Sequence, residues 1–278
     1  MNTDKKHFML SIENLRIGYR GRALFDDFSL SVAPGEFVVV LGQNGVGKST
    51  LLKALAGDFT LHGFPDRTSS GKLTLNGEDA RRIAPQRLAQ LRAVLAQSVP
   101  NTFAVPVNEV VQLGRYAHLD GAAMPFSVDV LVQDMLALAG VAPLAQRDIT
   151  TLSGGEFARV QFARALAQLW TLDSHRLPPR YLLMDEPTAA LDLVQQHRLF
   201  ATARRLTRAW NIGALAIAHD CNLAARHADR LVLIGEGRVI ADGPPREVMR
   251  TDLLERCYGA PMQIAGVDED AVASIFPA

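Results

Sequence analysis

Residues 37–50 read FVVVLGQNGVGKST and join an unbroken apolar run to a glycine-rich loop that ends in a lysine and two hydroxyl residues. The run 37–41 lacks polar alternation and is rich in β-branched residues, which predicts a strand buried on both faces of a parallel sheet. The residues after the loop, STLLKALAG, predict a helix that Gly57 stops. A strand, a glycine loop and a helix in this order indicate a phosphate-binding loop.

The chemistry of this loop follows from its residue types. Its pattern is G-x-x-x-x-G-K-[ST], in which glycines let successive backbone N–H groups point at phosphate oxygens and the helix adds its positive dipole end. Lys48 would reach the β- and γ-phosphates, and Ser49 would offer a hydroxyl to Mg²⁺. The alternative, a chance glycine-rich turn, does not account for the flanking strand and helix. The residues expected to bind ATP here are Gly42, Gln43, Asn44, Gly45, Val46, Gly47, Lys48, Ser49 and Thr50.

Two acids follow a later apolar run. The stretch YLLMDEP places Asp185 and Glu186 at the end of a predicted strand, and the carboxyl ends of parallel strands line the ligand crevice. Asp185 would lie near Mg²⁺, and Glu186 would polarise an attacking water. A solvated strand end is the alternative, and only the phosphate loop elsewhere in the chain favours the functional interpretation.

Composition sets the remaining limits. The chain has 278 residues, is 48% apolar and has a formal net charge of zero, so no basic field points to nucleic acid or to an anionic membrane. No signal-peptide pattern or run of the ~20 apolar residues that span a bilayer is present, and we expect a soluble protein. Cys221 and Cys257 have neither metal-site spacing nor a disulfide framework, and the seven histidines are scattered.

Alternation of strands and helices predicts an α/β fold with a mainly parallel sheet covered on both faces. Residues 106–146 have helical patterns and predict a helical lobe. Residues 8–18 and 24–32 are predicted strands, and 71–77 is predicted as a half-exposed antiparallel strand. Other predicted strands cover 92–97, 181–187, 214–220 and 231–237. Other predicted helices cover 85–92, 156–170, 192–209 and 221–227.

A second possible anion site lies at residues 152–156, LSGGE, which we call the signature loop. Ser153 precedes an amphipathic helix with an expected buried stripe of Phe157, Val160 and Ala163, so it is a good N-cap. A helix N-terminus with two glycines is also suited to phosphate. The residues alone leave both roles open.

In order, the motifs are GQNGVGKST, Gln97, LSGGE, YLLMDEP, AALD and His219, and with them the chain resembles ATP-binding cassette (ABC) transporter ATPase subunits over almost its whole length. The resemblance implies a P-loop NTPase of ABC type with an N-terminal antiparallel β subdomain and a helical subdomain. It implies a single domain over 1–278, in which roughly 98–165 is the helical subdomain and 166–278 is the second part of the RecA-like core plus a C-terminal extension.

In this family two cassettes pack head to tail, which implies a homodimer. Ser153, Gly154, Gly155 and Glu156 would face the ATP bound by Lys48 of the second copy, so each chain would carry half of two sites. The helix dipole at the signature loop would act on the same γ-phosphate.

Further residue roles are implied by the same resemblance. Tyr19 matches the aromatic that stacks on adenine, although it could be an ordinary edge-strand tyrosine. Gln97 matches the glutamine that senses Mg²⁺ and links to the helical lobe, His219 the γ-phosphate contact, and Asp192 a residue that crosses the dimer interface. The implied catalytic set is Glu186, His219, Lys48 and Gln97, and the implied metal set is Ser49, Gln97 and Asp185. Departures from the family pattern are Ala96, Glu156, Phe157 and Ala158.

The resemblance implies an ATP-hydrolysing translocase at the cytoplasmic face of a bacterial inner membrane. Its partners would be two separate permease subunits and, indirectly, a periplasmic substrate-binding protein, with no nucleic acid. PPRYLLMDEPTAALDLVQQH most resembles the haem (hemin) import branch, with ferric-siderophore and cobalamin import as alternatives. A soluble ABC-type ATPase acting on DNA or ribosomes is a further alternative, which the lack of coiled-coil heptads and of a basic stripe disfavours. A small-molecule kinase would leave LSGGE and His219 without a role.

Overall fold

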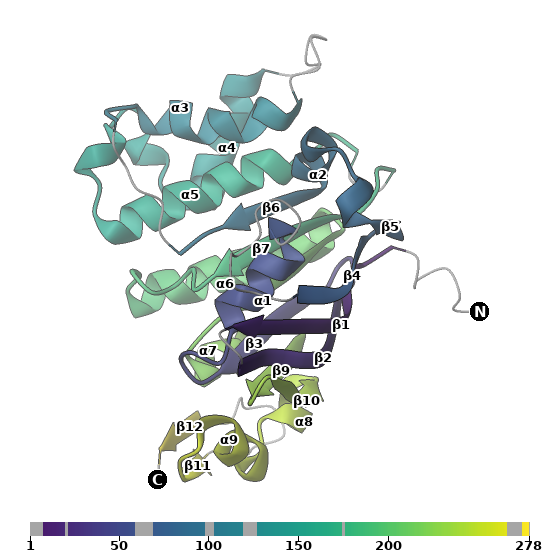
Figure 1. The fold of residues 1–278 in the computed structure, drawn as a ribbon. Coiled ribbons are helices and arrows are strands. Elements are labelled where there is room, and N and C mark those ends of the chain that lie inside the picture. The colour runs from purple at the N-terminus through teal and green to yellow at the C-terminus, as the bar shows by residue number, and fades with distance from the viewer. Residues whose placement is uncertain are drawn as a thin grey trace.

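The computed structural model describes residues 8–19, 22–58, 69–97, 103–118, 127–173, 176–265 and 274–277 (Figure 1). Its centre is a six-stranded sheet in the order β10-β9-β3-β8-β7-β6. All neighbouring strands pair in parallel except β10, which is antiparallel to β9 and was not predicted. The parallel sheet is therefore confirmed. Its strands are β3 (Phe37–Gly42), β6 (Arg92–Leu95), β7 (Arg180–Asp185), β8 (Ile212–Ile217), β9 (Arg230–Gly235) and β10 (Arg238–Gly243).

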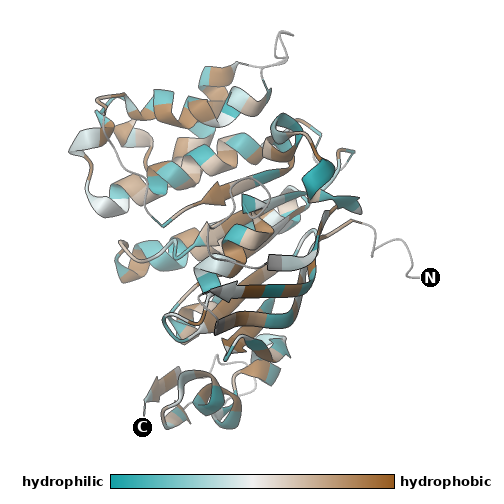
Figure 2. Ribbon diagram, viewed as in Figure 1, coloured by the Kyte–Doolittle hydropathy of each residue, from teal (hydrophilic) through white to brown (hydrophobic). Residues whose placement is uncertain are grey.

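Every residue of β3 is buried because the sheet separates two apolar cores. Phe37, Val39 and Leu41 pack into one core, while Val38 and Val40 pack into the other. Apolar residues accordingly follow one another along the central strands in Figure 2. The unbroken apolar run in the sequence thus reflects burial on both faces.

A four-stranded antiparallel sheet covers one face of the central sheet, and an antiparallel subdomain of this kind was expected from the sequence. Its order is β2-β1-β4-β5, and β1 pairs antiparallel with both β2 and β4. The second apolar core fills the space between this sheet and the central one. The strands are β1 (Leu10–Tyr19), β2 (Arg22–Val32), β4 (Ser69–Leu75) and β5 (Glu78–Asp79).

Helices gather at one end of the molecule, beyond β6 (Figure 1). There α5 packs against α3, α4 and β6. The elements are α2 (Pro85–Leu91), α3 (Val107–Gln112), η4 (Leu113–His118), α4 (Val128–Leu138) and α5 (Gly154–Leu169), with short turns η5 (Ala142–Leu144) and η6 (Ile149–Thr151). A further turn, η3 (Ala80–Arg82), contacts β4 of the antiparallel sheet. The predicted boundary near 165 falls inside α5, and the division into subdomains stays a prediction.

Two buried arginines hold the C-terminal end of α5. Arg115 Nη1 donates to Ala167 O over 2.7 Å and to Trp170 O over 2.9 Å, while Arg180, the first residue of β7, donates to Leu169 O. Burial lowers the pKa of each guanidinium to about 10. Cations at a helix C-terminus are favourable because the last carbonyls carry negative partial charge. These bonds fix α5, and with it the signature loop, relative to β7.

The remaining helices flank the sheet, and the C-terminal elements lie at the end opposite the α3–α5 layer (Figure 1). They are α1 (Lys48–Leu55), α6 (Leu193–Ala209), α7 (Cys221–His227), α8 (Pro245–Val248), α9 (Thr251–Tyr258), β11 (Met262–Ala265) and β12 (Ser274–Pro277). Among the helices of the described segments, none combines the length and the apolar composition that a membrane crossing needs.

Candidate nucleotide site

The predicted phosphate loop joins β3 to α1. Gly45 and Gly47 have φ values of 81° and 106°, a region that favours glycine, and Gly47 is the N-cap of α1. Within the described part of the chain, the N–H groups of Gly45, Gly47 and Lys48 have no hydrogen-bond acceptor. Free N–H groups at a helix N-terminus form an anion cradle, so the loop fits the triphosphate predicted for it.

Lys48 is buried and its ammonium lies against the loop itself. Nζ donates to Gly42 O over 2.8 Å and to Gln43 O over 3.0 Å. Burial lowers the pKa of Lys48, and the nearby charges of Glu186 and Asp185 oppose that shift. A bound phosphate would offer this ammonium a stronger, charged acceptor than the two carbonyls.

The structure brings Ser49 and Asp185 together from α1 and β7. Ser49 Oγ donates to Asp185 Oδ1 over 3.0 Å, and Asp185 is buried. Burial raises the pKa of this carboxyl, and the Ser49 bond opposes the shift. A hydroxyl and a carboxylate are hard oxygen donors of the kind that Mg²⁺ takes, with phosphate oxygens completing its coordination. The pair therefore fits the predicted metal ion.

Glu186 contacts two other predicted catalytic residues, Gln97 and His219. Its Oε1 lies 2.6 Å from His219 Nε2, and its Oε2 accepts a hydrogen bond of 2.8 Å from Gln97 Nε2. Gln97 lies just beyond β6, which ends at Leu95, and His219 lies just beyond β8, which ends at Ile217, so the predicted strands 92–97 and 214–220 both extended too far. The three side chains thus meet just beyond the carboxyl ends of β6, β7 and β8, the edge at which ligands bind in parallel sheets.

The backbone of Glu186 is unusual, because its φ is +48°. A non-glycine residue in this region costs about 1–3 kcal/mol and is concentrated at functional sites. The left-handed residue turns the chain sharply after β7, and Glu186 O accepts a bond from Ala189 N over 3.2 Å. This turn sets the direction of the Glu186 side chain.

The signature loop begins α5 with a capping box. Ser153 Oγ accepts from Glu156 N over 3.3 Å, and Ser153 N donates to Glu156 Oε2 over 2.8 Å. These bonds to Ser153 lower the pKa of Glu156. Val160 and Ala163 are buried as predicted, and Phe157 packs partly against the same core. The N-cap role is confirmed, whereas contact with the ATP of a second copy stays a prediction.

The structure leaves the predicted roles of Asp192 and Tyr19 untested. Asp192 is the N-cap of α6, where its Oδ1 accepts from Gln195 N over 2.8 Å, and its role across a dimer interface stays a prediction. Tyr19 is the last residue of β1, opposite Arg22, but its side chain lies outside the described part, and stacking on adenine stays a prediction.

The two glycines of the signature loop differ in their surroundings. A Cβ on Gly155 would lie 2.8 Å from Ala190 O, whereas a Cβ on Gly154 would lie 3.6 Å from Ala190 Cβ, an ordinary contact. Gly155 therefore allows the loop to approach the segment between Glu186 and Asp192 closely.

This difference gives a matched pair of variants. Gly155→Ala should destabilise the chain by roughly 1–3 kcal/mol because it overpacks this contact. Gly154→Ala should be neutral or stabilise by up to about 1 kcal/mol, as alanine favours a helix. Urea unfolding of both variants checks the prediction, which equal stabilities of the two would contradict.

A phosphate loop on a parallel sheet, an acid pair at a strand end and a signature helix define a P-loop ATPase of the ABC class. Residues 25–189 match the family model described as ABC transporter, and the chain belongs to this family as an ATPase. A protein of Burkholderia thailandensis named Hemin import ATP-binding protein HmuV is 50% identical over 272 residues, which cover 97% of this chain and 100% of that protein. The protein of the same name in Hydrogenovibrio crunogenus is 40% identical over 258 residues, covering 92% of this chain and 95% of that one.

Solved structures agree with this family. An inward-facing ABC transporter assigned to the metal-chelate type is 28% identical, with a TM-score of 0.75 and coverage of 97% of both chains. A bacterial Atm1-family ABC exporter with ATP bound is 25% identical, with a TM-score of 0.70, over 89% of this chain and 41% of that one. The fold expected from the sequence is thereby confirmed.

Proposed function

We propose that this chain is the ATPase subunit of a haem (hemin) importer and works as a homodimer beneath two permease subunits. The observation that carries the ATPase chemistry is the convergence of Gln97 and His219 on Glu186, beside the Lys48 loop. The cargo is inferred from the relatives of 40–50% identity named for hemin import, which match nearly the whole chain. The place of action is the cytoplasmic face of a bacterial inner membrane, where the chain is peripheral.

Binding would use the loop first. The free N–H groups and Lys48 Nζ hold the β- and γ-phosphates, and Lys48 exchanges its carbonyl acceptors for phosphate oxygens. Mg²⁺ would be held by Ser49 and Asp185, with Gln97 as a further oxygen donor, and would neutralise charge on the phosphates.

Hydrolysis would depend on Glu186 as the general base. Its carboxylate orients a water and takes a proton from it while the water oxygen bonds to the γ-phosphorus and the bond to the leaving ADP oxygen breaks. Gln97 and His219 each contact one carboxylate oxygen, and each oxygen keeps a second lone pair that can accept a bond from the attacking water. His219 would donate to the γ-phosphate once it exchanges Glu186 for a phosphate oxygen.

The second half of each site would come from another copy of the chain. Ser153 and Gly154 are exposed and Gly155 is partly exposed at the start of α5, where a helix N-terminus can meet a phosphate. Asp192 lies in the segment that follows Glu186, and the next two residues, Leu193 and Val194, are exposed apolar side chains. ATP would join the copies, and loss of its γ-phosphate would release them.

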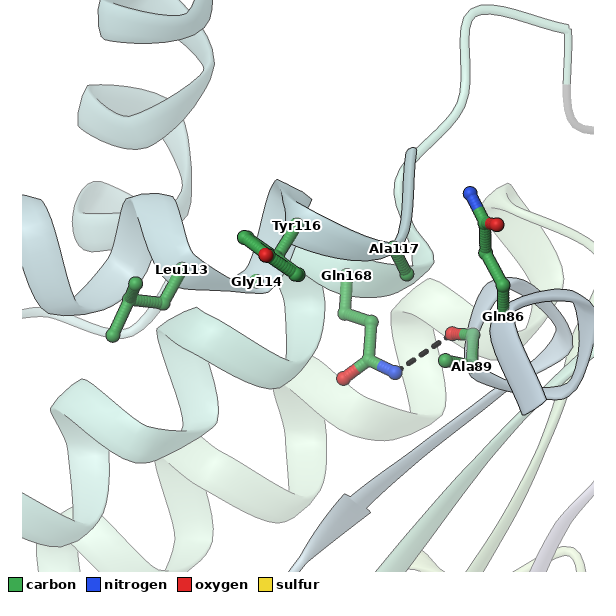
Figure 3. Close-up of a pocket in the computed structure, with 7 residues that line it drawn as sticks. All are labelled: Gln86, Ala89, Leu113, Gly114, Tyr116, Ala117 and Gln168. Carbon is green, nitrogen blue, oxygen red and sulfur yellow. Dashed lines mark hydrogen bonds between the residues drawn. The ribbon is translucent and has the colours of Figure 1, made fainter. Parts of the chain in front are cut away.

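A groove in the helical layer suits a helix of the permease. α2, η4 and α5 form it, and its lining residues are Gln86, Ala89, Leu113, Gly114, Tyr116, Ala117 and Gln168 (Figure 3). Leu113 and Tyr116 are 60% and 75% exposed, and large apolar side chains of this kind mark interaction sites.

Hydrogen bonds and strand β6 connect the groove to Glu186. Gln168 Nε2 donates to Ala89 O over 2.7 Å (Figure 3) and also to Arg92 O over 2.9 Å. Arg92 starts β6, and Gln97 beyond its other end bonds Glu186. A helix seated in the groove would thus sense changes at Glu186 through one short strand.

Tyr116→Asp tests this docking site. We expect at least about tenfold weaker capture of the chain by its permease, because an aromatic anchor is replaced by a charge. Val130→Asp is the control, since Val130 is 61% exposed on α4 but does not line the groove. Equal capture of both variants, measured by co-purification, would contradict the docking site.

The proposed function is tested by reconstituting the chain with its permease and binding protein in liposomes. ATP-dependent uptake should be seen with haem and not with ferric siderophores or cobalamin. Uptake of either alternative in preference to haem would overturn the cargo. ATPase activity stimulated by DNA or ribosomes, without any uptake, would overturn transport.

A further inference from the structure

We propose that Arg159 is a positioning residue that locks the signature loop to the segment after Glu186, so that a chain's own hydrolysis site controls the half-site it lends to its partner. The inference rests on the proposed function, because it assumes that the signature loop serves the second copy's ATP. It adds a residue that the motif pattern does not contain.

Arg159 joins three parts of the fold. Its Nε donates to Gly155 O over 3.3 Å, within the first turns of α5. Its Nη1 donates to Gly140 O over 3.0 Å, at the end of α4, and lies 3.4 Å from Gln195 Oε1 in the first turn of α6. One half-buried guanidinium therefore holds the signature loop, the helical layer and α6 together, and its fixed planar fork suits such bridging.

Gln195 continues this connection. Its side chain accepts from Arg159, while its backbone N–H donates to the Asp192 cap over 2.8 Å. The next residue, Gln196, donates through Nε2 to Thr188 O over 3.2 Å and to Leu191 O over 3.1 Å. Residues 188–196 are thus tied into one unit that presents Asp192.

A steric contact reinforces the hydrogen bonds. Gly155 packs so closely on Ala190 O that a Cβ would reach 2.8 Å, and Ala190 lies in the unit just described. Glu186 is tied to the start of the same unit through its carbonyl, which accepts from Ala189 N. A movement of Glu186 would therefore displace residues 188–196 and, through Arg159 and Gly155, the signature loop.

The test separates binding to a chain's own loop from contact with the second copy. All chains carry Glu186→Gln to block turnover. Arg159→Met keeps much of the apolar volume but loses every hydrogen bond. We expect its affinity for ADP, which needs only the phosphate loop, to stay within about twofold, while ATP-driven dimerisation weakens about tenfold or more. Arg198→Met is the control, because Arg198 and Arg159 line one cavity of about 290 Å³. This variant should leave the ADP affinity and the dimerisation unchanged.

Gln195→Leu completes a double-mutant cycle. It removes the side-chain acceptor but keeps the backbone N–H that Asp192 caps, and its effect on dimerisation should not add to that of Arg159→Met. Unchanged dimerisation in Arg159→Met, or fully additive effects, would overturn the inference alone. If the Glu186→Gln parent itself stays monomeric with ATP, the proposed function fails and takes the inference with it.

Discussion

Replacement of Glu186 by glutamine is expected to lower the rate of ATP hydrolysis about 10²–10⁴-fold, the contribution of a general base. The amide keeps nearly the same shape and can still contact Gln97 and His219, but it cannot accept a proton from water. Because the phosphate loop is untouched, ATP should bind and accumulate in a dimer. Phosphate release and light scattering measure the two effects.

The control for this variant is Glu236→Gln. Glu236 has a φ of +50°, so it shares the left-handed backbone and the charge of Glu186, but it is exposed in the turn between β9 and β10. It should hydrolyse ATP at the parent rate. Full activity in Glu186→Gln would remove Glu186 from its proposed role, whatever the oligomeric state.

Replacement of Lys48 by alanine should lower the affinity for ATP at least about thirtyfold, the effect expected when one partner of a buried charge pair is removed. The ammonium is already buried and fixed by Gly42 O and Gln43 O, so little ordering is needed when phosphate binds. Titration with ATP checks the affinity.

Lys72→Ala is the matched control, because Lys72 is an exposed lysine of β4 in the antiparallel sheet. Its affinity for ATP should equal that of the parent. Unchanged affinity in Lys48→Ala would contradict the assignment of the phosphate loop.

The sequence predicted the central sheet well because its patterns have local causes. The apolar run at 37–41 is continuous since adjacent side chains enter different cores, and the glycines at 45 and 47 have the positive φ that the loop requires. Six motifs in order then identified the class. Strand β10 was missed because most of its residues are only partly buried, which leaves a weak apolar pattern.

The contacts of Arg159 could not be predicted in the same way. Gly140 lies 19 residues before it and Gln195 lies 36 residues after it, so their meeting depends on how three helices pack. The spacing to Gly155 is helical and is the one local signal. Likewise, the motif order identified Gln97 and His219 as candidate catalytic residues, but only the fold shows that both contact Glu186.

The capping geometry of Ser153 is compatible with the second role predicted for it. Its hydroxyl takes part in the capping box, in which Ser153 Oγ also lies 2.9 Å from Glu156 Oε2. A γ-phosphate offered by a second copy could replace Glu156 as the acceptor of the hydroxyl proton, while the cap to Glu156 N is kept. One residue can therefore begin the helix and complete a nucleotide site.

A mixture of two defective chains tests most directly whether ATP is shared between copies. One chain carries Lys48→Ala and the other Ser153→Arg, both with Glu186→Gln. Neither should dimerise alone with ATP, but the mixture should give mixed dimers with one ATP, because one composite site is intact. Mass and nucleotide content are measured by light scattering and chromatography. Dimers of Ser153→Arg alone that form as readily as those of the parent, or no mixed dimers at any ATP concentration, would contradict the account.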